Sequence, residues 1–73
     1  MHLEQLGSLI AFHRKRAGLS QAELASHAAV SRYVVQNLEM GTDRTTWKTL
    51  EAVLVVLNIR LEPEGPLVEE WRR

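Results

Sequence analysis

Residues 18–41 read GLSQAELASHAAVSRYVVQNLEMG, and this stretch decides the fold. Ser20 precedes an apolar segment with helical periodicity, and Glu23 lies three residues after Ser20. This spacing is the pattern of a capping box at the start of a helix. Ser31 repeats the start signal after a short gap. The stretch therefore predicts two short helices, one ending near Ala28 and the other extending from Ser31 to Glu39, separated by only a few residues.

The segments on either side of this stretch also have helical periodicity. Before it, apolar residues recur at helical spacing over residues 3–17, and Gly18 supplies a left-handed stop. After a polar loop at residues 41–45, Thr45 or Thr46 is expected to cap a further helix. That helix contains Trp47, Leu50, Val53, Leu54 and Leu57.

A different pattern follows at the end of the chain. Leu57, Ile59 and Leu61 alternate with polar residues, which predicts a short strand over residues 57–62. Because a strand edge needs a partner, these three residues are expected to pair with the same strand of a second subunit. Two prolines and a glycine within residues 63–66 are expected to prevent a helix from starting there. Residues 1–62 are thus assigned to the folded domain and residues 63–73 to a flexible tail.

Composition excludes several classes of protein. The chain has 73 residues, enough for one small domain, and no cysteine, which rules out a disulfide scaffold and a thiolate zinc site. The three histidines have no ligand spacing and no phosphate loop or nucleophile motif is present, so we expect no metal, no cofactor and no enzyme activity. The longest apolar run is too short to span a bilayer, and a cytoplasmic protein is expected.

Charge is unevenly distributed although the formal net charge is zero. Residues 14–48 contain six basic and three acidic side chains, whereas residues 62–73 contain two basic and four acidic ones. The middle of the chain therefore carries +3 and the tail −2, and a local basic region is what binding to nucleic acid requires.

The second helix of the pair carries side chains suited to reading bases. If Val35 and Leu38 face inward, the outward side holds Arg32, Tyr33, Gln36 and Asn37. Arginine pairs with guanine, asparagine and glutamine pair with adenine, and tyrosine can touch a thymine methyl or the sugar-phosphate backbone. Gln21 begins the first helix, where a phosphate can bind. Taken alone, such a helix is better explained as a solvated polar face. The paired helices and the short turn favour DNA recognition.

The sequence resembles the lambda-repressor-like (Cro-type or XRE-type) helix-turn-helix family over about residues 3–60. The segments that carry the resemblance are Leu6-Gly7, Arg14, Gly18-Leu19-Ser20-Gln21, Glu23-Leu24-Ala25, Val30-Ser31, Leu38-Glu39 and Gly41. The resemblance implies an all-α, four-helix domain in which the expected C-terminal strand pairs across a dimer. One position departs from the family: the turn usually carries glycine where this chain has Ala29. Alanine can adopt a positive φ at a cost of about 1 kcal/mol, so the turn is expected to be either slightly strained or differently shaped.

The resemblance also implies residue roles. Gln21 corresponds to a phosphate contact, and Ser31 lies close to the DNA backbone. Base-reading positions are Arg32, Tyr33 and Asn37, while Gln36 and the basic Arg44 complete the predicted DNA-binding set. Arg14 and Glu39 correspond to a pair that often forms a salt bridge between the first and third helices.

A narrower resemblance concerns the end of the chain. A short strand and a near-terminal Trp71 are similar to the antitoxins that pair with Hip-type kinase toxins, which implies an autoregulated operon, a palindromic operator and a toxin partner bound through Trp71. A disordered end is the plain alternative for Trp71. Two functional alternatives stay open: a free-standing repressor without a toxin, and a protein-binding adaptor that uses the same fold.

Overall fold

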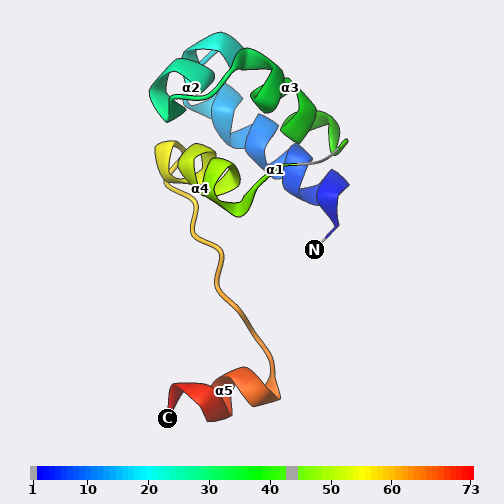
Figure 1. Ribbon diagram of the computed structural model, residues 1–73, viewed down its shortest axis with the longest axis vertical. Helices are drawn as coiled ribbons and strands as arrows, with labels where there is room; N and C mark the ends of the chain where they lie inside the picture. Colours follow the sequence, from blue (N-terminus) through cyan, green and yellow to red (C-terminus); the bar gives the residue numbers. More distant parts are fainter. Residues whose placement is uncertain (1, 43–44) are drawn as a thin grey trace.

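Both helices predicted within residues 18–41 are present, as α2 (Gln21–Ala28) and α3 (Arg32–Met40). They belong to a computed structural model that describes residues 2–42 and 45–73. The other helices are α1 (Leu3–Arg16), α4 (Trp47–Val56) and α5 (Pro66–Arg72). In Figure 1, α1 to α4 pack together and α5 lies apart at the end of an extended arm.

Serine caps fix where α2 and α3 begin. The Ser20 hydroxyl accepts a hydrogen bond from the Glu23 backbone N–H at 3.0 Å, and the Glu23 carboxylate accepts one from the Ser20 N–H at 2.9 Å. This capping box satisfies two N–H groups that a helix start would leave unpaired. Hydrogen bonding from Ser20 to the Glu23 carboxylate, first of all from the Ser20 backbone N–H, lowers the pKa of Glu23. The Ser31 hydroxyl similarly accepts from the Val34 N–H at 3.2 Å.

The turn between α2 and α3 is left-handed at Ala29, which has φ 57° and ψ 42°. The Val30 N–H donates to the Ala25 carbonyl at 2.9 Å and so closes the end of α2. Of the two alternatives expected from the sequence, the structure has the strained turn, because an alanine occupies a conformation that glycine adopts without a steric penalty. The left-handed turn at Ala29 allows α3 to begin with only three residues, 29–31, between it and the end of α2.

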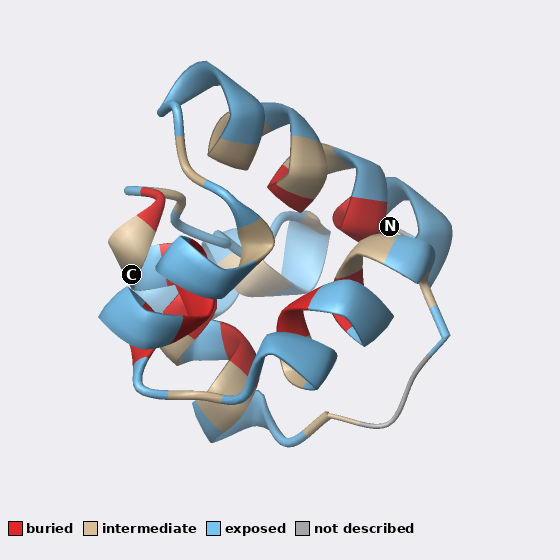
Figure 2. Cartoon of the chain, turned by 90° about the horizontal axis from the view of Figure 1, so that it is seen from above, coloured by how far each residue is buried: buried red, intermediate tan, exposed pale blue. Residues whose placement is uncertain are grey.

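One core holds α1 to α4 together. In Figure 2 the buried positions face inward, toward the centre of the helix group. The core consists of eleven apolar residues: Leu6, Ile10, Leu24, Ala25, Ala28, Val35, Leu38, Leu50, Val53, Leu54 and Leu57. Val35 and Leu38 are the inward residues predicted for α3, whereas Trp47, which the sequence grouped with the apolar side of α4, is 61% exposed. Within this core, α3 packs against both α1 and α2, and α4 packs against α2.

Helices α1 and α3 approach each other closely at Gly7 of α1. A Cβ built on Gly7 would overlap the carbonyl oxygen of Leu38 and lie 2.7 Å from that of Glu39, both in the backbone of α3. Only a residue without a side chain fits this crossing. Gly7 therefore sets how near α1 comes to α3.

The strand predicted over residues 57–62 is not seen, and residues 57–59 cap the end of α4 instead. Asn58 has a left-handed φ of 59°, and the Ile59 N–H donates to the Leu54 carbonyl at 2.9 Å. This is the Schellman arrangement, in which an apolar residue after the left-handed position packs back on the helix. Leu57 is accordingly buried and Ile59 packs against the core. The alternation of apolar residues therefore arises from the end of a helix and not from a strand. Leu57 and Ile59, two of the three residues expected to pair across a dimer, thus pack in the core or against it and do not form a strand.

The expectation that no helix starts within residues 63–66 is also wrong. Pro66 is the first residue of α5, where its fixed φ suits a helix and its missing N–H has no partner to lose. A proline that would break the interior of a helix is thus compatible with its first position. The described part of the chain has five helices in place of the expected four.

We predict that Gly7→Ala destabilises the domain. The new methyl group pushes α1 away from the α3 backbone, and such overpacking lowers the free energy of unfolding by about 2 kcal/mol. Urea unfolding followed by circular dichroism measures this change. Ser8→Ala, at the exposed neighbouring position, is the control and should change stability by less than about 0.5 kcal/mol. A Gly7→Ala protein as stable as the original would contradict the close approach.

We also predict that Ala29→Gly stabilises the domain, because glycine relieves the positive φ. The expected gain is about 0.5–1 kcal/mol in the same unfolding measurement. Ala22→Gly, on the exposed side of α2, should have the opposite sign, with a loss of about 0.5–1 kcal/mol. Equal effects at the two positions would show that Ala29 is not strained.

Candidate nucleic-acid interface

The outward side of α3 presents one continuous polar surface. Five of its positions, including the N-cap, are exposed: Ser31, Arg32, Tyr33, Gln36 and Asn37. Tyr33 is 67% exposed, and the guanidinium carbon of Arg32 lies 5.8 Å from the centre of its ring. The structure therefore brings the predicted base-reading residues together on one helix face, where no other described part of the chain covers them.

Sequence reasoning missed one exposed residue on this helix. Met40 is 58% exposed at the end of α3, one turn beyond Gln36. Met40 lies four residues after Gln36, and residues four apart share a helix face. This spacing alone would have predicted that Met40 is exposed beside Gln36. The exposed surface of α3 thus ends in a flexible apolar side chain next to the Gly41 stop.

Arg14 and Glu39 form an ion pair between α1 and α3. Arg14 Nε donates to Glu39 Oε2 at 2.6 Å and Nη2 donates to Oε1 at 3.0 Å, a bidentate arrangement. The side chains are only 12% and 8% exposed. The hydrogen bond to Glu39 raises the pKa of Arg14. This pair fixes the end of α3 against α1 and does not itself reach the exposed surface of α3.

The ion pair extends to α2 and to the loop before it. Arg14 Nη1 donates to the Leu19 carbonyl at 2.8 Å, and Gln21 Nε2 donates to Glu39 Oε1 at 3.1 Å. Glu39 therefore receives hydrogen bonds from α1 and from the first residue of α2. The predicted phosphate contact, Gln21, is half-buried and its amide is engaged inside the protein. No sequence signal marks this link, because the two residues are eighteen positions apart and meet only in the fold.

Other predicted site residues lie elsewhere. Arg44 is outside the residues that the structure describes. Trp71 is 77% exposed on α5, far from α3 in Figure 1. Leu57 and Ile59 belong to the core and its margin.

Across residues 2–42 and 45–73, no group of three His, Cys, Asp or Glu side chains could hold a metal ion, and no helix there is long and apolar enough to cross a membrane.

The comparison with known families agrees with this geometry. The sequence model of a helix-turn-helix domain family matches residues 5–64, which is most of the chain and includes α2 to α4 and all but the first two residues of α1. No curated protein matches the chain.

We predict strong coupling between Arg14 and Glu39. Arg14→Met leaves a nearly buried carboxylate with Gln21 as its remaining side-chain partner and should lower the free energy of unfolding by about 2–3 kcal/mol. The double variant Arg14→Met/Glu39→Met removes both charges and should be less destabilised than the sum of the two single variants. Chemical unfolding of all four proteins gives the coupling energy. Simple additivity would mean that the two side chains act independently.

Proposed function

The chain belongs to the helix-turn-helix domain family, which is typical of DNA-binding regulators, and on that premise we propose that it is a sequence-specific transcriptional repressor. The observation that carries the proposal is the exposed surface of α3, on which the guanidinium of Arg32 and the carboxamides of Gln36 and Asn37 are all exposed. An adaptor that binds only protein would not need this set of base-complementary groups.

In this proposal α3 enters the major groove of double-stranded DNA. Arg32 would make a bidentate contact to guanine, and Gln36 or Asn37 would do the same for adenine. Tyr33 would contact a thymine methyl or the sugar-phosphate backbone. These contacts use the first two turns of α3, as expected of a recognition helix whose N-terminal residues reach the base edges.

Contacts to the DNA backbone would come from the elements around α3. Ser31 at the start of α3 and Gln21 at the start of α2 lie where helix N-terminal N–H groups favour a phosphate. Arg44 is proposed as a further phosphate contact from its charge and its place in the sequence after α3. The net charge of +3 over residues 14–48 supports such contacts and predicts binding that weakens with salt.

We further propose that the repressor acts as a homodimer on a palindromic operator. Two recognition helices about 34 Å apart would then reach successive major grooves on one side of the duplex. Its place of action would be the cytoplasm, at the nucleoid.

A second candidate is an antitoxin that represses its own operon and binds a Hip-type kinase toxin. The observation in its favour is Trp71, which is exposed on a helix that the arm holds away from the domain. The strand that also suggested this subgroup is absent, so we rank a repressor without a toxin first. A kinase that co-purifies with the native protein, and is lost on Trp71→Ala, would reverse this ranking.

The DNA-binding proposal is tested first by selecting preferred sites from a random duplex library and then by fluorescence anisotropy at fixed salt. Arg32→Ala and Asn37→Ala should each weaken binding to the selected site by about 1–3 kcal/mol and relax the preference at one base position. Gln21→Ala should weaken binding to all sequences alike.

Matched controls make the result specific to α3. His27→Ala, at an exposed position of α2, should leave affinity unchanged. Circular dichroism must show that Gln21→Ala is folded, since Gln21 also bonds Glu39. If no site is enriched, or if Arg32→Ala and Asn37→Ala both bind like the original, α3 does not read DNA and the adaptor alternative gains support.

A further inference from the structure

The apolar side of α5 has no cover in the described part of the chain. Leu67 and Trp71 are four residues apart, hence on one face of the helix, and each is 77% exposed. No residue of α5 is buried. Two large apolar side chains exposed together on a seven-residue helix are unusual for a chain that functions alone.

The arm keeps α5 from covering its own domain. Arg72 Nη2 donates to the Pro63 carbonyl at 3.1 Å, and Nη1 pairs with Glu69 at 3.2 Å. These bonds fold α5 back against the end of the arm, and the two prolines at positions 63 and 66 stiffen the connection. Figure 1 shows the result, a helix separated from α1 to α4 by an extended segment.

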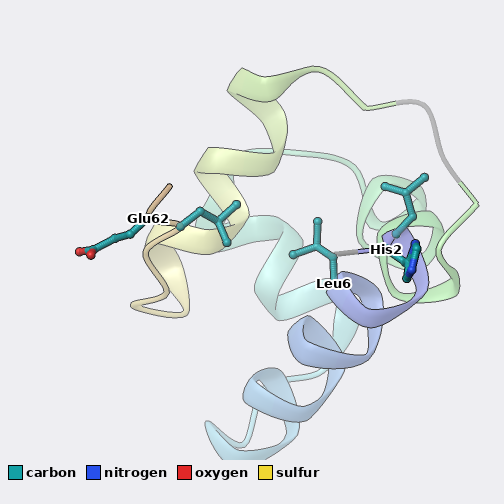
Figure 3. Close-up of a pocket in the computed structure, with 5 residues that line it drawn as sticks. His2, Leu6 and Glu62 are labelled. Carbon is teal, nitrogen blue, oxygen red and sulfur yellow. The ribbon is translucent and has the colours of Figure 1, made fainter. Parts of the chain in front are cut away.

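A small apolar groove lies where the arm leaves the domain. It is lined by His2, Leu3, Leu6, Leu61 and Glu62 and has a volume of about 290 Å³. In the view of Figure 3, Leu6 lies between His2 and Glu62, and the Glu62 carboxylate points away from Leu6. The groove suits one large side chain with a cationic neighbour, because its inner surface is apolar and Glu62 is at its edge.

The exposed area of the chain exceeds that of a compact monomer by an amount similar to one side of a dimer interface. The accessible surface is 5667 Å², whereas a compact monomer of 8.3 kDa exposes about 4,600 Å². The excess of about 1,100 Å² per chain is comparable to the area of about 800 Å² that each partner contributes to a stable interface. The radius of gyration, 13.3 Å against about 11 Å for a compact chain of this length, shows the same extension.

We propose that two copies of this chain form a two-fold dimer by exchanging α5. Trp71 of one copy enters the groove formed by Leu3, Leu6 and Leu61 of the other, and Leu67 packs against the rim of that groove at Leu3. A second copy is the occupant because every chain carries both the exposed helix and the groove. The charges agree as well, since Arg73 lies two residues after Trp71 and Glu62 lies at the groove edge, while Arg72 keeps its bonds to Glu69 and Pro63.

The length of the arm sets the geometry of this dimer. From Leu61 to Pro66 the chain spans at most about 17 Å, so the two grooves must lie near each other and close to the two-fold axis. Each groove then combines residues of one copy with α5 of the other and is incomplete in a single chain. The inference concerns assembly alone, and its test uses no DNA, so it can fail without the DNA-binding proposal failing.

Cysteine cross-linking tests the exchange directly, because the chain has no cysteine of its own. Leu3→Cys and Leu67→Cys proteins, tagged to differ in mass, are mixed and mildly oxidised. The exchanged dimer should give the mixed disulfide, which requires Cα atoms within about 7 Å. Phe12→Cys replaces Leu3→Cys as the control, since both positions are 58% exposed on α1 but nine residues apart, on opposite helix faces.

Other products overturn the proposal. A disulfide only between two Leu67→Cys chains would mean that α5 of one chain packs against α5 of the other and not in the groove. An intramolecular disulfide in the Leu3→Cys/Leu67→Cys double variant, with the protein monomeric, would mean that α5 folds onto its own domain. Equal cross-linking of Phe12→Cys and Leu3→Cys would show that the contact is not specific.

Sedimentation equilibrium gives an independent readout. The original chain should dimerise at tens of micromolar, and Trp71→Ser should weaken the dimer at least tenfold. Trp47→Ser, which removes the other exposed tryptophan from α4, should leave the dimer unchanged. The exchange is overturned if the original chain is monomeric at about 200 µM, or if the Trp71→Ser protein dimerises as before. In either case α5 does not bind a second copy of this chain.

Discussion

The approach of α1 to α3 at Gly7 is the constraint on which the rest of the structure depends. The α3 backbone lies so near Gly7 that a side chain there would meet the carbonyl groups of Leu38 and Glu39. Two turns further along α1, Arg14 reaches Glu39 and forms the bidentate ion pair. Backbone proximity and the ion pair thus fix both the distance and the rotation of α3, and its polar residues face outward as a consequence.

Glu39 connects this constraint to α2. Its carboxylate accepts from Arg14 and from Gln21, while Arg14 also holds the Leu19 carbonyl just before the α2 cap. A small core of eleven apolar residues fills the space between the helices but has no directional preference of its own. The hydrogen bonds at Glu39 supply that direction, so the starts of α2 and α3 keep a fixed relation to each other.

Local signals made much of the fold predictable. The serine caps, the left-handed Ala29 and the inward Val35 and Leu38 depend on residues within one or two helical turns, so the sequence shows them directly. The end of α4 was misread because Asn58 followed by an apolar residue fits both a strand and a Schellman cap, and only the φ of Asn58 separates them. For the site, the exposed residues of α3 were predictable from periodicity, whereas the bond from Gln21 to Glu39 and the contact at Gly7 arise between segments far apart in sequence.

The placement of the two tryptophans has a consequence for spectroscopy. Trp47 and Trp71 are 61% and 77% exposed, and neither belongs to the core. Their indole rings already meet water in the folded chain, so the emission wavelength of the protein reports little about the loss of core packing on unfolding. The same exposure makes that emission sensitive to whatever surface comes to rest on either ring, and intrinsic fluorescence in this molecule is therefore a probe of association.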